Sequence, residues 1–274
     1  MKNVLVASVT LAFSAVAVAA PMTIAGSDTL AGVMSDAINQ SGLQSELTYA
    51  GGGSGKGETA IVAGQQGIAP MSRAFKAEAK EKATVAGIKL VEHVIGLDGL
   101  GIWVKKDNSL TRVDFDTLRK IFACEITKWD DVPYANKSGA IVAIRRDDAS
   151  GTTDTFKSLV GVKAFGECVK IMAETTDIAA ETSVNANAIA YAGLSAGRDA
   201  NRALSVSVKA DSAAILPTVR NIRTFAYPLA RKLFVYEAQG SVKPGAAEMK
   251  LIENVSDRSF IDPIIQQNEF ITLD

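Results

Sequence analysis

Short apolar runs alternate with amphipathic, helix-like stretches along most of the chain. This pattern predicts strands over 22–25, 46–50 and 67–71, and helices over 30–38, 58–63 and 74–86. A longer apolar stretch at 91–106 is interrupted at Asp98-Gly99, and we expect the strand to break there, where the chain changes lobe. Strands that alternate with helices along the sequence indicate an α/β protein.

The alternation restarts in the second half of the chain. We predict helices over 116–122, after the turn at 149–152 and near 183–188, strands over 140–144, 189–194, 204–208 and 229–236, and two C-terminal helices. Because no linker separates the halves, we expect two lobes joined by crossing strands near 101–106 and 225–235. The first lobe then comprises residues 20–104 and 225–274, and the second comprises residues 105–224.

The N-terminus has the pattern of a secretory signal peptide. Met1-Lys2-Asn3 is followed by an uncharged run over 4–20, which ends in Ala17-Val18-Ala19 before Pro21. The alternative is a membrane anchor, for which this run of small apolar residues is marginal in length. We expect cleavage after Ala19 rather than Ala20, and a periplasmic or secreted protein.

Composition narrows the classes of function. With 29 basic and 30 acidic side chains, the chain has no net field to attract nucleic acid, so an anion has to be bound by local geometry. The single histidine, His93, disfavours metal clusters and most hydrolytic sites, and we expect no metal, no cofactor and no catalytic residues. Cys124 and Cys168 lack CxxC spacing, which in an exported protein favours a structural disulfide over a metal or redox site.

Two short motifs resemble catalytic signatures without completing them. The glycine-rich stretch 51–57 departs from a Walker motif, because residue 50 is Ala and Lys56 is followed by Gly57. The stretch 193–197 matches the Gly-x-Ser-x-Gly nucleophile pattern, but no histidine follows Ser195 in the sequence. Nucleotide hydrolysis and esterase chemistry are both disfavoured.

Four junctions lead from a predicted strand through Gly, Ser or Thr into a helix, at 26–29, 51–57, 71–73 and 149–152. The first turn of a helix has free N–H groups and a partial positive charge, and neighbouring hydroxyls add donors, so each junction is a potential anion site. Ordinary helix capping is the alternative at any one of them. Arg146 adds a planar fork of donors suited to a tetrahedral oxyanion, unless it forms a surface ion pair with Asp147 or Asp148.

The order of these motifs resembles the phosphate-binding proteins of bacterial ABC importers, which belong to the periplasmic binding proteins whose two lobes close on a ligand. The matching stretches are 25–30 (AGSDTL), 51–57 (GGGSGKG), 72–73 (SR), 145–152 (RRDDASGT) and 188–194 (AIAYAGL), with support from 98–104, 118–129 and 227–231. The resemblance implies a two-lobed α/β fold with mixed sheets flanked by helices. It also implies a monomer that carries phosphate from an interlobe cleft to a membrane permease, without bond chemistry.

The same resemblance implies a ligand set. Its members are Thr29, Ser54 and Ser72 in the first lobe and Arg146, Ser150, Gly151 and Thr152 in the second, and Arg73, next to Ser72, is a further candidate ligand residue. Some relatives have an aspartate that accepts a proton from phosphate at the position of Arg73. Its loss leaves sulfate, arsenate or molybdate as alternative ligands.

Asp28 and Asp148 are candidate replacements for that proton acceptor, unless Asp28 caps its own helix and Asp148 orients Arg146. Cys124 stands where the family usually has Gly, which favours a local bridge to Cys168 within the second lobe. A phosphate sensor that feeds no transporter, and a secreted phosphatase-type hydrolase, are the remaining alternative functions.

Overall fold

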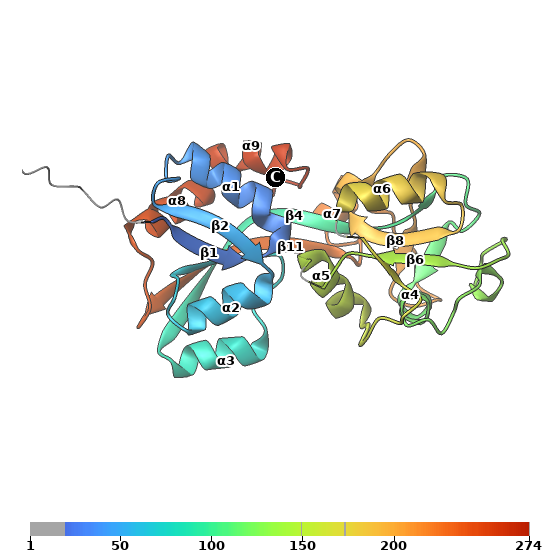
Figure 1. Cartoon of the computed structure of the whole chain (residues 1–274), viewed down its shortest axis with the longest axis horizontal. Coiled ribbons are helices and arrows are strands. Elements are labelled where there is room, and N and C mark those ends of the chain that lie inside the picture. Colours follow the sequence, from blue (N-terminus) through green and yellow to red (C-terminus); the bar gives the residue numbers. More distant parts are fainter. Residues whose placement is uncertain (1–19, 149, 173, 274) are drawn as a thin grey trace, which may run out of the picture.

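Two α/β lobes lie side by side in the computed structural model, which describes residues 20–148, 150–172 and 174–273 (Figure 1). Two strands, β4 (Ile88–Lys105) and β11 (Ala230–Gly240), run between the lobes. The predicted signal peptide, residues 1–19, lies outside the described residues. Within the described part of the chain, no helix has both the length and the apolar character needed to cross a bilayer.

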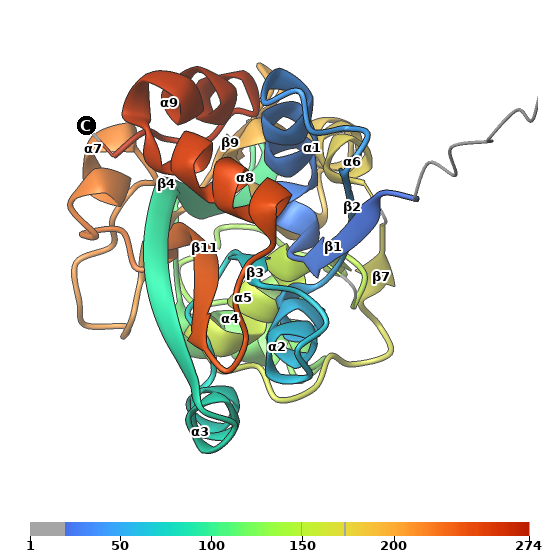
Figure 2. The same ribbon diagram turned by 90° about the vertical axis from the view of Figure 1, so that its left-hand side faces the viewer.

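The first lobe combines both ends of the chain. Its strands are β1 (Met22–Gly26), β2 (Leu47–Gly52) and β3 (Ile68–Met71), and its helices are α1 (Ala31–Gln40), α2 (Ser54–Val62), α3 (Ala77–Val85), α8 (Ala246–Ser256) and α9 (Arg258–Gln267). The helices α1, α8 and α9 lie on one side of the strands and α2 and α3 on the other (Figure 2). Ile24, Met34, Leu233, Leu251 and Ile261 are fully buried in one hydrophobic cluster, so β1, α1, β11, α8 and α9 share a core.

The second lobe extends the sheet through which the crossing strands pass. Its strands are β5 (Arg112–Asp114), β6 (Val142–Arg145), β7 (Lys170–Ile171), β8 (Ala188–Gly193), β9 (Asn201–Ala203) and β10 (Ser205–Ser207), and its α-helices are α4 (Phe115–Phe122), α5 (Gly151–Val160), α6 (Thr175–Val184) and α7 (Val219–Arg223). In the sheet that runs through both lobes, the strand order is β3-β11-β4-β8-β6-β7. In its core, the rings of Phe156 and Tyr191 stack with centroids 4.0 Å apart.

The expected break at Asp98-Gly99 is wrong, because β4 continues through it as one strand of 18 residues. Residues 88–99 of β4 pair with β11, and residues 100–104 pair with β8. The polar residue does not end the strand, since the Asp98 carboxylate accepts bonds from the Gly99 N–H and from Arg231. The interruption in hydrophobicity marks a change of pairing partner.

The helix expected near 183–188 is also wrong in its placement. The structure has α6 over Thr175–Val184, and Ala188 already begins β8. Asn185 ends the helix in an extended conformation, and its side-chain oxygen accepts a bond of 2.9 Å from the Asn187 N–H. This local side-chain bond competes with the helical pattern.

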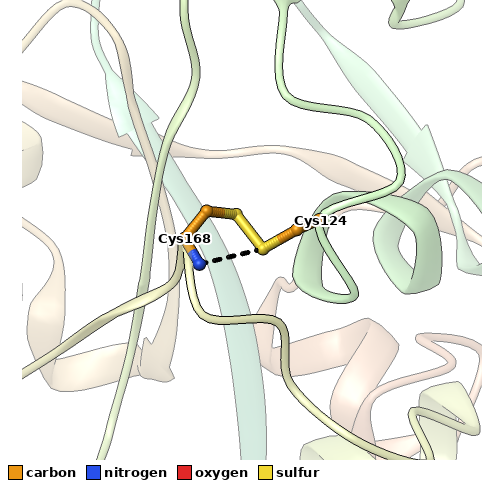
Figure 3. The surroundings of a disulfide bond; sticks show 2 residues. All are labelled: Cys124 and Cys168. Carbon is orange, nitrogen blue, oxygen red and sulfur yellow. Dashed lines mark hydrogen bonds between the residues drawn. A yellow bond between two sulfur atoms is a disulfide. The ribbon is translucent and has the colours of Figure 1, made fainter.

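The two cysteines form a disulfide within the second lobe, as the resemblance implied (Figure 3). Cys124 follows α4, and Cys168 precedes β7. The φ of Cys124 is 64°, in the left-handed region that favours glycine, the residue usual at this position in the resembling family. The covalent bond therefore holds a backbone conformation that a residue with a side chain adopts at some cost.

We expect the replacement of both cysteines by serine to lower the free energy of unfolding by about 2–4 kcal/mol, because the bridge closes a long loop in the unfolded chain. The cysteines are 44 residues apart in sequence. Urea denaturation of the variant and of the oxidised wild type measures the difference. Reduced wild type is the matched control and should unfold with the variant; an unchanged midpoint in both would contradict the prediction.

Candidate oxyanion site

Three serine hydroxyls from separate junctions of the first lobe meet in a buried cluster. Ser27 follows β1, Ser54 begins α2 after β2, and Ser72 follows β3, and all three are fully buried. The Ser27 hydroxyl donates to Ser72 Oγ at 2.8 Å, and Ser54 Oγ accepts from the Ser72 N–H at 3.3 Å. The junctions selected from the sequence therefore converge in this lobe.

The first turn of α5, in the second lobe, lies against these hydroxyls. A Cβ atom at Gly151 would lie 2.7 Å from Ser72 Oγ, 2.8 Å from Ser27 Oγ and 2.9 Å from Thr29 Oγ1. Only glycine allows this approach, because real Cβ atoms are not found so close to other heavy atoms. Figure 1 shows α5 at the boundary between the lobes. Hydroxyls from one lobe thus face the N–H groups of a helix terminus in the other, an arrangement suited to an anion.

Ser150 and Thr152, both buried, form the start of α5. Ser150 Oγ accepts from the Thr152 N–H at 3.2 Å, so Ser150 also caps the helix. The Thr153 hydroxyl lies 2.8 Å from the Tyr191 hydroxyl and fixes this turn on β8. Burial raises the pKa of Tyr191 above its ordinary value, and the phenol stays neutral beside the site.

Arg146 is held within the second lobe. Its Nη1 donates to Thr175 Oγ1 at 3.0 Å, while its buried Nε has no hydrogen-bond partner among the described residues. The alternative in which Asp148 orients Arg146 is wrong, because Asp148 accepts two bonds, of 2.8 and 3.1 Å, from Arg145. These bonds hold the pKa of Asp148 below its ordinary value. The Arg146 guanidinium therefore keeps unused donor capacity.

Asp28 lies at the edge of the hydroxyl cluster. Its Oδ1 accepts from the Gly52 N–H at 2.7 Å, and its buried Oδ2 has no hydrogen-bond partner in the part of the chain that the structure describes. The expectation that Asp28 caps its own helix is wrong, since the 3₁₀ helix Asp28–Leu30 has Ser27 at its N-cap and no side-chain cap bond. Burial, and then the Asp28 charge, raise the pKa of Tyr49, whose hydroxyl donates to the Ser27 carbonyl at 2.7 Å.

Arg73 is neutralised by an acidic side chain that the sequence did not single out. Its guanidinium forms two bonds to Glu58, of 2.5 and 3.1 Å, and the two side chains are 12% and 7% exposed. The Lys76 N–H also donates to Glu58, at 2.7 Å. The positive charge next to Ser72 is therefore largely balanced within the first lobe.

A cavity of about 740 Å³ borders the cluster at Ser72. The first lobe contributes Arg73 and Lys76 to its wall, α5 contributes Asp154 and Lys157, and the start of β11 contributes Arg231 and Lys232. Arg73 and Arg231 are paired with Glu58 and Asp98, so the lysines Lys76, Lys157 and Lys232 against Asp154 leave a positive balance that favours anions in this cavity. Phe225 and Phe234 complete an apolar part of the wall.

Besides Glu58, three residues of the site were missed from the sequence. Ser27 lies two positions before Thr29 in a junction that was identified, yet it was not assigned a contact. Arg231 and Asp98 form a buried ion pair of 2.6 Å, with side chains 5% and 4% exposed. The available signal was that each is a charged residue placed within a largely apolar predicted strand, where a buried charge needs a partner of opposite sign.

The family of the chain is shown by comparison with known proteins. A family model described as a PBP superfamily domain matches residues 14–255. A protein of Staphylococcus epidermidis (strain RP62A), named phosphate-binding protein PstS, is 30% identical over 194 residues, which cover 70% of this chain and 59% of the relative. A protein of the same name from Staphylococcus aureus (strain USA300) is 27% identical over 237 residues, covering 84% of this chain and 72% of the relative. The chain spans about three fifths of the length of the S. epidermidis relative.

Solved structures share the fold. An ABC-type phosphate transport receptor from Vibrio cholerae superposes with a TM-score of 0.76 at 21% identity, covering 92% of this chain and 99% of that one. A possible phosphate binding protein from Planctomyces limnophilus gives a TM-score of 0.75 at 21% identity, covering 93% and 94%. The two-lobed α/β architecture expected from the sequence is confirmed.

The ion pair between Arg73 and Glu58 leads to a prediction about stability. Arg73→Ala leaves the Glu58 carboxylate buried and unpaired, and we expect the free energy of unfolding to fall by about 3–5 kcal/mol. In Arg73→Met/Glu58→Gln the charge is absent, and the glutamine still accepts from Lys76, so most of the loss should be recovered. Urea denaturation measures both variants. Equal losses in the two would show that the packing of Arg73, and not the unpaired charge, is responsible.

The approach at Gly151 leads to a prediction about binding. In Gly151→Ala, the added methyl group must displace α5 from the three hydroxyls, and we expect anion affinity to fall by more than about tenfold because the closed arrangement of the lobes is overpacked. Gly55→Ala is the matched control, because its Cβ would have only Arg73 Nη2 nearby, at 3.9 Å. Isothermal titration of both variants with phosphate provides the measurement. Similar affinities in the two variants would contradict the prediction.

Proposed function

Because the chain belongs to the PBP superfamily, we propose that it captures inorganic phosphate between its lobes and delivers it to an ABC importer. The observation that supports this most directly is the approach of Gly151 to three hydroxyls of the other lobe. The staphylococcal relatives, named phosphate-binding proteins, support the same ligand class. We retain residues 20–104 with 225–274, and residues 105–224, as the proposed lobes.

The proposed ligand set follows from the cost of burying an anion. Burial of a phosphate dianion is favourable only where nearly every oxygen meets a donor, and no single type of group supplies enough of them. Hydroxyls of the first lobe, N–H groups of the first turn of α5 and one guanidinium together provide such a shell. We assign the contacts to Thr29, Ser54, Ser72, Ser150, Gly151, Thr152 and Arg146.

Selectivity for phosphate requires an acceptor for the proton that phosphate carries and sulfate lacks. We assign this role to Asp28, because its buried Oδ2 is without a hydrogen-bond partner among the described residues. Asp148 is a weaker candidate, since it is 74% exposed and already bonded to Arg145. Arg73 does not convert the site to a general oxyanion site on this proposal, because Glu58 balances its charge.

A hydrolase that used this cluster would have no histidine base near it. His93 Nε2 lies 2.9 Å from Glu237 Oε2, and His93 Nδ1 lies 3.1 Å from Ser256 Oγ, so the only histidine is engaged elsewhere in the first lobe. The relatives are binding proteins. The disulfide fits an oxidising compartment, and with a signal peptide cleaved after Ala19 it supports a periplasmic or secreted location.

Isothermal titration of ligand-stripped mature protein with phosphate and sulfate, at pH 5, 7 and 9, tests this function. We expect micromolar or tighter phosphate binding, about −8 kcal/mol, and exclusion of sulfate. Arg146→Ala should weaken phosphate binding by about tenfold to 100-fold, through loss of charged hydrogen bonds. Asp28→Asn should admit sulfate, because an amide no longer repels an unprotonated oxyanion, whereas the control Asp148→Asn should not.

The outcomes separate the parts of the proposal. Sulfate binding as tight as phosphate binding in the wild type would contradict the role of Asp28 while leaving the oxyanion site. Phosphate binding that survives Arg146→Ala unchanged would remove Arg146 from the ligand set. Absence of binding to either anion would contradict the assignment of phosphate as the ligand.

A further inference from the structure

Arg231, near the start of β11, bonds to residues of both lobes at once. Its Nε and Nη2 donate to Asp98 Oδ2 at 2.9 and 2.6 Å, and Nη2 also donates to Thr29 Oγ1 at 3.4 Å. Its Nη1 donates to the Gly151 carbonyl at 3.0 Å and to Thr155 Oγ1. A guanidinium has five N–H donors, and five bonds are present, so its capacity is fully used.

We propose that Arg231 is a positioning residue that couples the hinge to the ligand site and stabilises the closed arrangement of the lobes. The inference rests on the proposed capture of phosphate. Thr29 belongs to the first lobe, and Gly151 and Thr155 belong to α5 of the second, so the guanidinium bonds to all three only while the lobes are together. Separation of the lobes must break at least one of these bonds.

The hinge holds Arg231 in place. Arg231 on β11 is directly opposite Asp98 on β4, and the next pair, Ala230 with Gly99, is the last one before β4 changes its partner to β8. The ion pair therefore lies where the crossing strands leave one lobe for the other. A buried ion pair seldom adds net stability, since its desolvation cost is comparable to its Coulomb gain, so its position at the hinge calls for another role.

The bonds of Arg231 also orient two members of the proposed ligand set. Because Thr29 Oγ1 accepts from Arg231, its own proton is free to point toward an anion. The Gly151 carbonyl accepts from Arg231 and, at 2.8 Å, from the Thr155 hydroxyl, which fixes the first turn of α5. Arg231 thus acts on the ligand through these two neighbours.

Three variants test this role. Arg231→Gln removes the guanidinium donors but leaves the buried Asp98 carboxylate unpaired, so this variant is at risk of failing to fold. Arg231→Gln/Asp98→Asn removes both charges, so the fold should be retained while the bonds that favour closure are lost. Arg231→Lys keeps a charge for Asp98, but three donors on a flexible stem cannot reproduce the fork to both lobes.

We expect phosphate affinity to fall by about 10–100-fold in the double variant and in Arg231→Lys, with most of the change in the dissociation rate. Stopped-flow binding gives the rates, and urea denaturation should give midpoints near the wild type for the double variant. Spin labels at Glu81→Cys and Lys163→Cys, exposed positions on the two lobes, should report a larger open population at subsaturating phosphate.

Arg258→Gln is the matched control. It removes a partly buried arginine whose bonds, to the Ile95 carbonyl and Asp262, stay within the first lobe, and it should leave the dissociation rate unchanged. A stable double variant that binds and releases phosphate at wild-type rates would overturn the inference while the proposed function stands. A wild type without affinity for phosphate would overturn the proposed function, and with it this inference.

Discussion

The contact between the first turn of α5 and the hydroxyls of the opposite lobe depends on the absence of a side chain at Gly151. With oxygen atoms 2.7–2.9 Å from where a Cβ would stand, the two lobes approach as closely as backbone and hydroxyl groups permit. Donors from both sides can then surround one small anion. Neither lobe alone presents enough of them, because the hydroxyls and the helix terminus belong to different segments of the chain.

Such an approach requires that the lobes meet in a fixed register, which the crossing strands provide. β4 keeps one continuous backbone while it passes from β11 to β8, so the lobes are joined through a hydrogen-bonded strand and not through a free linker. Arg231 and Asp98 lie at that change of partner, and the guanidinium extends from it to Thr29 and Gly151. The change of strand partner and the proposed ligand site are therefore linked through one side chain.

Much of this architecture was predictable from the sequence, because the spacing of apolar residues and the residue types at turns are local properties. The four junctions were found in this way, and the predicted strands at 22–25, 46–50 and 67–71 lie within two residues of β1, β2 and β3. The pairing of charges was not predictable. Arg145 and not Arg146 binds Asp148, although both are three or fewer positions away, because Arg145 ends β6 whereas Arg146 lies beyond the strand and donates to Thr175 instead. The partners Glu58 and Asp98 are separated from their arginines by 15 and 133 residues.

Arg73 stands where some members of the resembling family are expected to have an aspartate, and this difference shows why the ion pairing of Arg73 matters for specificity. A cation beside Ser72 would favour any oxyanion, and the overall charge of the chain, −1, could not offset so local a field. Glu58 offsets most of that charge through its ion pair with Arg73, but the Glu58 oxygens are then occupied by Arg73 and by the Lys76 N–H. A proton acceptor has to be supplied by a different group, and Asp28 has the unpartnered oxygen for it among the described residues. On this interpretation Glu58 balances the charge of Arg73, and Asp28 accepts the proton of phosphate.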